Sequence, residues 1–124
     1  MTRSTWPRLP ELEHAAMGVI AKRPLAGAVW RTATRPETYA EGAYWDRWQA
    51  MGLEQTVPQA DWNELALRFI AHLPGVACSI VGTNKLAHLE QNLATIAKGP
   101  LPTEQHEQVY AAFQRKQHNW IGLI

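Results

Sequence analysis

Two short apolar runs constrain the fold of this chain more than any other feature of its sequence. They are MGVIAK, residues 17–22, and VACSIV, residues 76–81. Their length and their β-branched content favour buried strands, and Cys78 inside the second run is expected to be a small core residue. Helical patterns separate and follow the two runs. Strands alternating with helices are typical of parallel βα units, so the sequence predicts an α/β fold.

The number of strands limits what this fold can be. A parallel sheet of only two strands leaves two apolar edges without hydrogen-bonding partners, which complete domains avoid. The sequence therefore predicts an arc of a closed barrel rather than a whole one.

Several helices have recognisable ends. Asp61 is expected to cap the clearest one, with Glu64 three residues later as in a capping box, and Pro74-Gly75 ends it. Thr103 is expected to cap the last helix. Helices are also predicted for residues 10–16, for residues 39–51, and for a segment after residue 84 with one apolar stripe: Leu86, Leu89, Leu93 and Ile96.

Composition describes an ordinary globular domain and excludes several functions. The 124 residues suffice for one domain; 46% are hydrophobic and 19% charged, and the net charge of +1 gives no footprint for nucleic acid or an anionic membrane. No apolar run approaches the roughly 20 residues that span a bilayer, and residues 1–10 lack the apolar stretch of a signal peptide. One cysteine excludes an internal disulfide and fits a cytoplasmic protein, and the five scattered histidines predict no metal site.

Longer motifs in the chain resemble the aldo/keto reductases, NADP-dependent oxidoreductases built on a (β/α)8 TIM barrel. The similar stretches follow the order of the family's last two βα units and C-terminal tail, and they cover most of the chain. They are GVIAKRPLAGAVWR (18–31), DWNELALRFIAHLPGVACSIVGTNKLAHLEQNL (61–93), KGPLP (98–102) and NWIGLI (119–124). The resemblance implies a partial TIM barrel, with residues 1–124 as the C-terminal fragment of a reductase domain.

The resemblance also implies a cofactor site at the end of the first strand. Lys22 and Arg23 stand where the family usually has an aromatic and a small polar residue, the aromatic one stacking on the nicotinamide. Pro24 and Leu25 fit the pattern that lines the pyrophosphate path. From the residues alone, Lys22 and Arg23 are equally a solvated strand terminus or part of a site at a barrel mouth.

A second part of the implied site follows the second strand. Gly82, Thr83 and Asn84 resemble the turn that holds the 2′-phosphate of the adenosine ribose. Glycine, hydroxyl and amide groups before a helix N-terminus suit an anion, although a plain capped loop has the same composition.

The helix after this turn supplies the remaining implied contacts. His88 stands at a position that is often arginine in the family, and a neutral imidazole offers no bidentate fork to a phosphate. Gln91 and Asn92 resemble the Glu-Asn pair that contacts adenine.

The catalytic Tyr, Asp, Lys and His of the family lie in the first half of its barrel, so no catalytic residue is assigned here. The resemblance implies NADPH-dependent reduction of a carbonyl to an alcohol, with this chain inactive alone and its partner a complementary half-barrel or a second copy. Two alternatives remain: a non-enzymatic half-barrel that self-associates, and a non-functional gene remnant. Trp30, Trp45 and Trp120 either pack in the core or line a substrate pocket.

Overall fold

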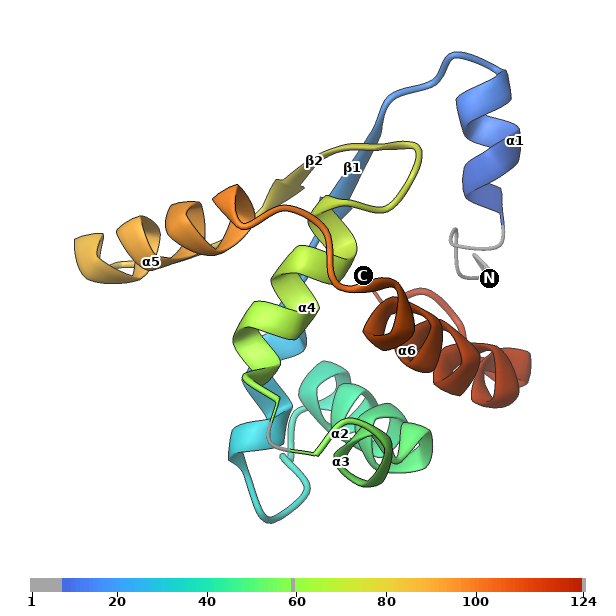
Figure 1. Ribbon diagram of the computed structural model, residues 1–124. Helices are drawn as coiled ribbons and strands as arrows, with labels where there is room; N and C mark the ends of the chain where they lie inside the picture. The colour runs from blue at the N-terminus through green and yellow to red at the C-terminus, as the bar shows by residue number, and fades with distance from the viewer. Residues whose placement is uncertain (1–7, 59, 124) are drawn as a thin grey trace. The chain divides into compact units, whose positions relative to one another are not determined.

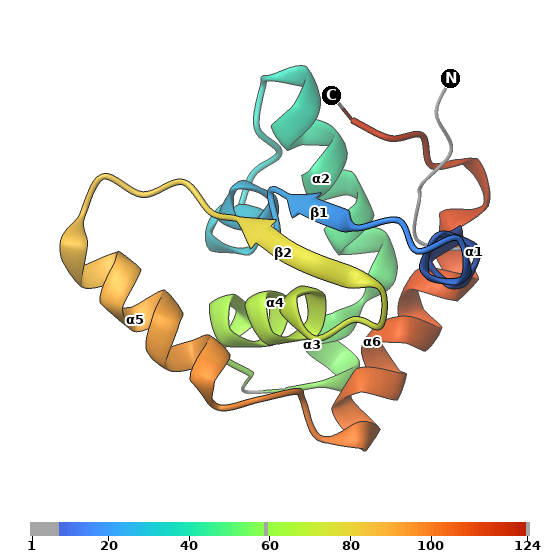
Figure 2. The same cartoon turned by 90° about the horizontal axis from the view of Figure 1, so that it is seen from above.

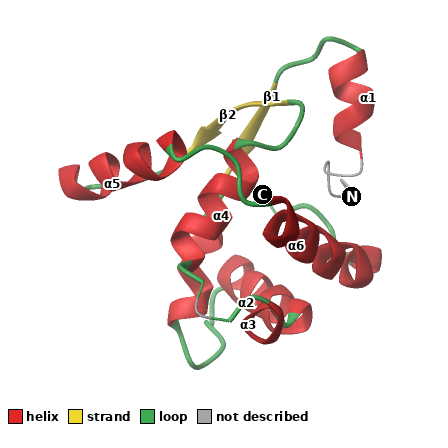
Figure 3. Ribbon diagram, in the orientation of Figure 1, coloured by secondary structure: helices red, strands yellow, loops and turns green. Residues whose placement is uncertain are grey.

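The computed structural model of this chain is mostly helical, with one small sheet (Figures 1 and 3). The mixed α/β class predicted from the sequence is therefore confirmed. The structure describes residues 8–58 and 60–123. These residues form two compact units, the first containing residues 26–58, 60 and 102–123, and the second containing residues 8–25 and 61–101.

The second unit contains both strands. Its elements are α1 (Leu9–His14), β1 (Val19–Lys22), α4 (Trp62–Ala71), β2 (Val76–Ile80) and α5 (Leu86–Ala97). The first unit is helical, with η2 (Ala26–Arg31), α2 (Tyr39–Met51), α3 (Leu53–Thr56), α6 (Thr103–Lys116) and η3 (Gln117–Asn119).

The two strands pair in parallel, as their sequence predicts. Ile20 lies opposite Cys78 and Lys22 opposite Ile80, with a register irregularity between Val19 and Ile20. Since successive side chains of a strand point to opposite faces, Ile20 and Lys22 share one face of the sheet with Cys78 and Ile80.

The prediction that both strands are buried is wrong for this shared face. Helix α4 packs on β2, but Ile20 and Ile80 are each 60% exposed and Cys78 is exposed as well. Cys78 is therefore not a core residue. The physical reason is coverage: within the second unit α4 is the helix that packs on the sheet, whereas the sequence argument assumed helices on both faces.

Helix α4 begins and ends where its sequence predicts. The Glu64 N–H donates to Asp61 Oδ1 over 3.0 Å, so Asp61 is the N-cap. The capping box is only half formed, because the Glu64 carboxylate binds Arg68 and Lys98 instead. Leu65, Leu67 and Phe69 are buried, and Gly75 turns the chain toward β2 with φ of +87°.

Helix α5 exposes the apolar stripe predicted for it. Leu86 is 70% exposed and Leu93 60%, and none of its residues is buried. The helix ends at Ala97, and Gly99 follows in the left-handed region with φ of +81°, as is common after a helix C-terminus.

The first unit has a core of its own around α6. Val109, Ala112 and Phe113 are buried on this helix and form its apolar side. The predicted cap is wrong: Thr103 is the first helical residue, Pro102 takes the cap position, and no side chain caps the helix. A threonine just inside a helix is not placed to accept from the N2 or N3 amide as an N-cap does.

Candidate functional site

The parallel pairing brings the two implied cofactor segments to one edge of the sheet. Both strands point the same way, and Lys22 lies opposite Ile80, so their carboxyl ends coincide (Figure 2). The chain leaves this edge through residues 23–25 after β1 and through residues 81–85 after β2. Because neighbouring strands lie about 4.8 Å apart, the two loops start side by side.

The turn after β2 is held by its own threonine. The Lys85 N–H donates to Thr83 Oγ1 over 3.2 Å, and the Thr83 hydroxyl lies 3.3 Å from the Lys85 carbonyl oxygen. Gly82 is exposed, and a Cβ added there would meet nothing within 4 Å. Lys85 is the N-cap residue of α5, and no side chain caps this helix, so the amides of its first turn have no side-chain acceptor.

The implied adenosine contacts lie on one side of α5. His88, Gln91 and Asn92 are spaced three and four residues apart and therefore share a helix face. This face is distinct from the apolar stripe that contains Leu89 and Leu93. His88 and Gln91 are exposed, and Asn92 is half-buried.

The structure thus places all the implied site residues in the second unit, in three short segments: the end of β1, the turn after β2, and α5. Most are exposed, while Pro24 and Leu25 are half-buried. Sequence reasoning left out Lys85, which adds an exposed cation to the turn. The position of Lys85, one residue after Asn84, is the sequence signal that could have identified it.

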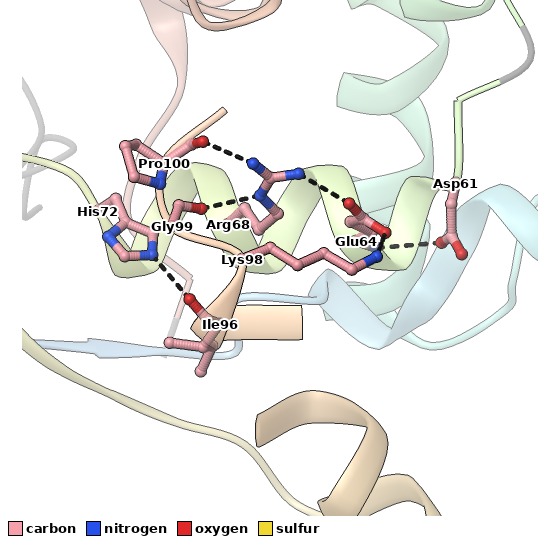
Figure 4. A network of polar contacts seen from close by, with 8 residues as sticks. All are labelled: Asp61, Glu64, Arg68, His72, Ile96, Lys98, Gly99 and Pro100. Atoms are coloured by element: carbon pink, nitrogen blue, oxygen red, sulfur yellow. Dashed lines mark hydrogen bonds and ion pairs between the residues drawn. The ribbon is translucent and has the colours of Figure 1, made fainter. Parts of the chain in front are cut away.

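A polar network fixes the far end of α5 to α4 (Figure 4). Arg68 donates from Nε to the Gly99 carbonyl oxygen over 2.8 Å and from its guanidinium to the Pro100 carbonyl oxygen over 2.6 Å. His72 Nε2 donates to the Ile96 carbonyl oxygen over 3.2 Å. These bonds satisfy carbonyl groups at and beyond the C-terminus of α5, where helices leave their carbonyls without partners.

The carboxylate of Glu64 completes the network. It accepts from Arg68 over 2.8 Å and from Lys98 Nζ over 2.6 Å. The Lys98 and Arg68 hydrogen bonds lower the pKa of Glu64 below its ordinary value of 4.5. Glu64 and Arg68 are 25% and 14% exposed, so the pair is more shielded from solvent than a surface ion pair.

This network predicts a stability difference that depends on pH. Glu64→Gln should lower the free energy of unfolding at pH 7 by about 1 kcal/mol, since it removes charge-assisted hydrogen bonds. The folded-state pKa is depressed, so the stabilisation is present above pH 4.5 and is lost as pH falls through that lowered pKa. Urea unfolding from pH 7 to pH 3 should show the wild-type and variant curves converging at the acid end.

Glu90→Gln is the matched control, because Glu90 is an exposed glutamate on α5. It should follow the wild type at every pH. A constant gap between Glu64→Gln and wild type across this range would contradict the assignment to Glu64.

Residues 8–58 and 60–123 contain no group of three or more His, Cys, Asp and Glu side chains arranged to hold a metal ion. In the same part of the chain, no helix combines the length and the apolar character needed to cross a bilayer.

Comparison with known proteins assigns the family. The model of the aldo/keto reductase family matches residues 11–113, which is most of the 124-residue chain. The chain therefore belongs to the aldo/keto reductase family, a family of oxidoreductases that are generally NADP-dependent. Searches of curated proteins and of solved structures gave no significant match.

Proposed function

We propose that this chain is the cofactor-binding, C-terminal part of an aldo/keto reductase domain and contributes to NADPH-dependent reduction of a carbonyl. In this proposal residues 1–124 form the last two βα units of a (β/α)8 barrel, with the C-terminal helix and tail. One observation carries it: β1 and β2 are parallel neighbours whose carboxyl ends bring residues 22–25 and 82–84 to one edge, in a chain of this family. Barrel enzymes keep their sites at this edge.

The residues at the edge suit the phosphates of a dinucleotide. Lys22, Arg23 and Lys85 are exposed cations, and within residues 8–58 and 60–123 none of them forms an ion pair with a carboxylate. The open space at Gly82 allows a phosphate to approach the backbone. The donor set therefore fits an anion.

Each segment has a role in this proposal. Pro24 and Leu25 line the pyrophosphate path, and Gly82, Thr83 and Asn84 hold the 2′-phosphate. His88 supports that phosphate less firmly than an arginine does, since it lacks a planar fork of donors. Gln91 and Asn92 contact adenine from their common face of α5.

The nicotinamide end differs from the usual family pattern. Bound NADPH supplies a hydride, and this chain's residues bind and orient it. Lys22 offers no aromatic ring to stack on the nicotinamide, so this position contributes charge instead. The groups that move a proton to the carbonyl oxygen are assigned to a complementary half of the barrel, and the isolated chain is expected to be inactive.

A second candidate function is a non-enzymatic module that self-associates. The exposed face of the sheet favours it, because Ile20 and Ile80 are each 60% exposed on neighbouring strands. A gene remnant without function would show neither cofactor binding nor a defined self-association.

The cofactor assignment predicts a difference between NADPH and NADH. Thr83→Ala combined with His88→Ala should weaken NADPH by roughly tenfold while changing NADH little, because only NADPH carries the 2′-phosphate. Dissociation constants are measured by tryptophan fluorescence on the full chain, alone and with any complementary half. Thr103→Ala with His118→Ala, one threonine and one histidine exposed in the first unit, is the matched control.

Equal losses for both cofactors would refute the 2′-phosphate assignment. No binding of either cofactor, with or without a complementary half, would refute the reductase proposal and leave the interaction module.

A further inference from the structure

One turn of α2 contacts two segments of the first unit that are far apart in sequence. Three of its residues hold the segment just before the helix. Trp45 Nε1 donates to the Thr32 carbonyl oxygen over 3.2 Å, and the Trp48 ring lies 5.6 Å from that of Trp30. Asp46 accepts three hydrogen bonds of 2.9 to 3.1 Å from the Arg35 guanidinium. We call residues 30–35 the loop segment.

The bond between Arg35 and Asp46 depends on a glycine. A Cβ at Gly42 would lie 2.7 Å from the Arg35 guanidinium, so a side chain at this position would displace the guanidinium from its present place. The pair lowers the pKa of Asp46, chiefly through the hydrogen bonds from Arg35. The loop segment is thus held to α2 by a forked ion pair, an indole hydrogen bond and a ring contact.

The fourth residue of the turn, Arg47, holds the other end of the chain. Its guanidinium donates to the Ile121 carbonyl oxygen over 2.7 Å and lies 5.3 Å from the centre of the Trp120 ring. Trp120 also contacts Phe113 of α6, at 5.8 Å between ring centres. Leu123 is buried at 8% exposure. We call residues 120–123 the tail.

These contacts lie on opposite sides of α2. Successive helix residues are turned by about 100°, so Trp45, Asp46 and Trp48 span one side and Arg47 points away from the middle of that span. The loop segment and the tail therefore hold the same helix from opposite sides.

Arg47 is costly to leave without its partners. Burial lowers its pKa, yet an arginine remains cationic at physiological pH, so its charge must be satisfied where it lies. The Ile121 carbonyl and the face of Trp120 provide this, one by a hydrogen bond and the other by a cation–π contact.

We propose that Arg47 is a latch for the C-terminal tail, and that releasing the tail loosens the loop segment on the other side of α2. The turn formed by residues 45–48 is the shared element. When Arg47 loses the tail, its guanidinium must find other partners or solvent, and we expect the turn of α2 that it shares with Trp45 and Asp46 to shift with it. The loop segment and the tail thus bind opposite sides of one helix, and none of the residues proposed to bind the cofactor takes part in these contacts.

The test uses the full chain labelled with 5-fluorotryptophan and observed by fluorine NMR, with each line assigned by a Trp→Phe variant. Arg47→Met keeps the length of the side chain but removes its charge and donors. We expect the Trp120 line to move toward its denatured-chain position, and the Trp30 and Trp45 lines to shift as well. Amide exchange in the tail should become roughly tenfold faster, the loss expected from one charge-assisted hydrogen bond.

Arg115→Met is the matched control, because Arg115 is an exposed arginine of α6 in the same unit. It should leave all three lines in place. An unmoved Trp120 line in Arg47→Met would overturn the latch, and a moved Trp120 line with unmoved Trp30 and Trp45 lines would overturn the coupling. If Arg47→Met does not fold, the same criteria apply to Arg47→Lys, which keeps the charge and loses the planar fork.

Discussion

Replacing Leu67 with alanine should lower the free energy of unfolding by about 3 kcal/mol, within the range measured for buried leucines. Leu67 lies in the middle of α4 and is 1% exposed, and it is the largest fully buried side chain among the described residues. Truncation removes the transfer free energy of the lost methyl groups and leaves a cavity that the surrounding side chains fill only in part. Urea unfolding, followed by circular dichroism at 222 nm, measures the change.

Leu86→Ala provides a control with the same chemistry. Leu86 is 70% exposed at the start of α5, so its truncation removes little buried area and should change the free energy of unfolding by less than about 0.5 kcal/mol. Similar losses in both variants would contradict the burial of Leu67 within a packed core.

Local patterns in the sequence predicted the elements that depend on local interactions. Helix α2 runs from Tyr39 to Met51 as predicted, and the Asp61 cap forms because acceptor and amide are three residues apart. The parallel pairing of the strands also followed from their alternation with helices. In each case the decisive groups are close in sequence or repeat with a fixed period.

Features that depend on distant partners did not follow from the sequence. The Arg68 bonds to Gly99 and Pro100 join residues more than 30 positions apart, and Arg47 meets Ile121 across 74 positions. The exposure of Cys78 has the same origin. Its strand has the composition of a buried one, but burial is decided by what covers the sheet, and no pattern within the strand reports that.

The candidate site was predicted as three separate segments, and its spatial arrangement came only with the strand register. That Lys22 lies opposite Ile80 is what brings residues 22–25 and 82–84 to the same edge. Lys85 was missed because the family pattern ends at Asn84, and its charge matters only when the turn is seen beside the end of β1.

The second large effect concerns the uncovered face of the sheet and the stripe on α5. Ile20 and Ile80 are each 60% exposed on paired strands, and Leu86, Leu89 and Leu93 are 70%, 45% and 60% exposed along one side of α5. Burying such a side chain contributes about 2 kcal/mol, so five of them from each of two copies outweigh an association cost of on the order of 10 kcal/mol. The isolated chain is therefore expected to self-associate at concentrations on the order of micromolar, unless a complementary half-barrel covers these residues.

Sedimentation velocity over a hundredfold range of concentration tests this expectation. Leu89→Glu combined with Leu93→Glu should shift the chain toward monomer, because two carboxylates would have to be desolvated in any contact that buries the stripe. Tyr39→Glu is the control, since Tyr39 is 74% exposed in the first unit, apart from the α5 stripe in sequence and unit. A wild-type chain that remains monomeric throughout and unfolds in one cooperative, calorimetrically two-state transition would contradict the half-barrel proposal, because open strand edges and an uncovered apolar face would then carry no penalty.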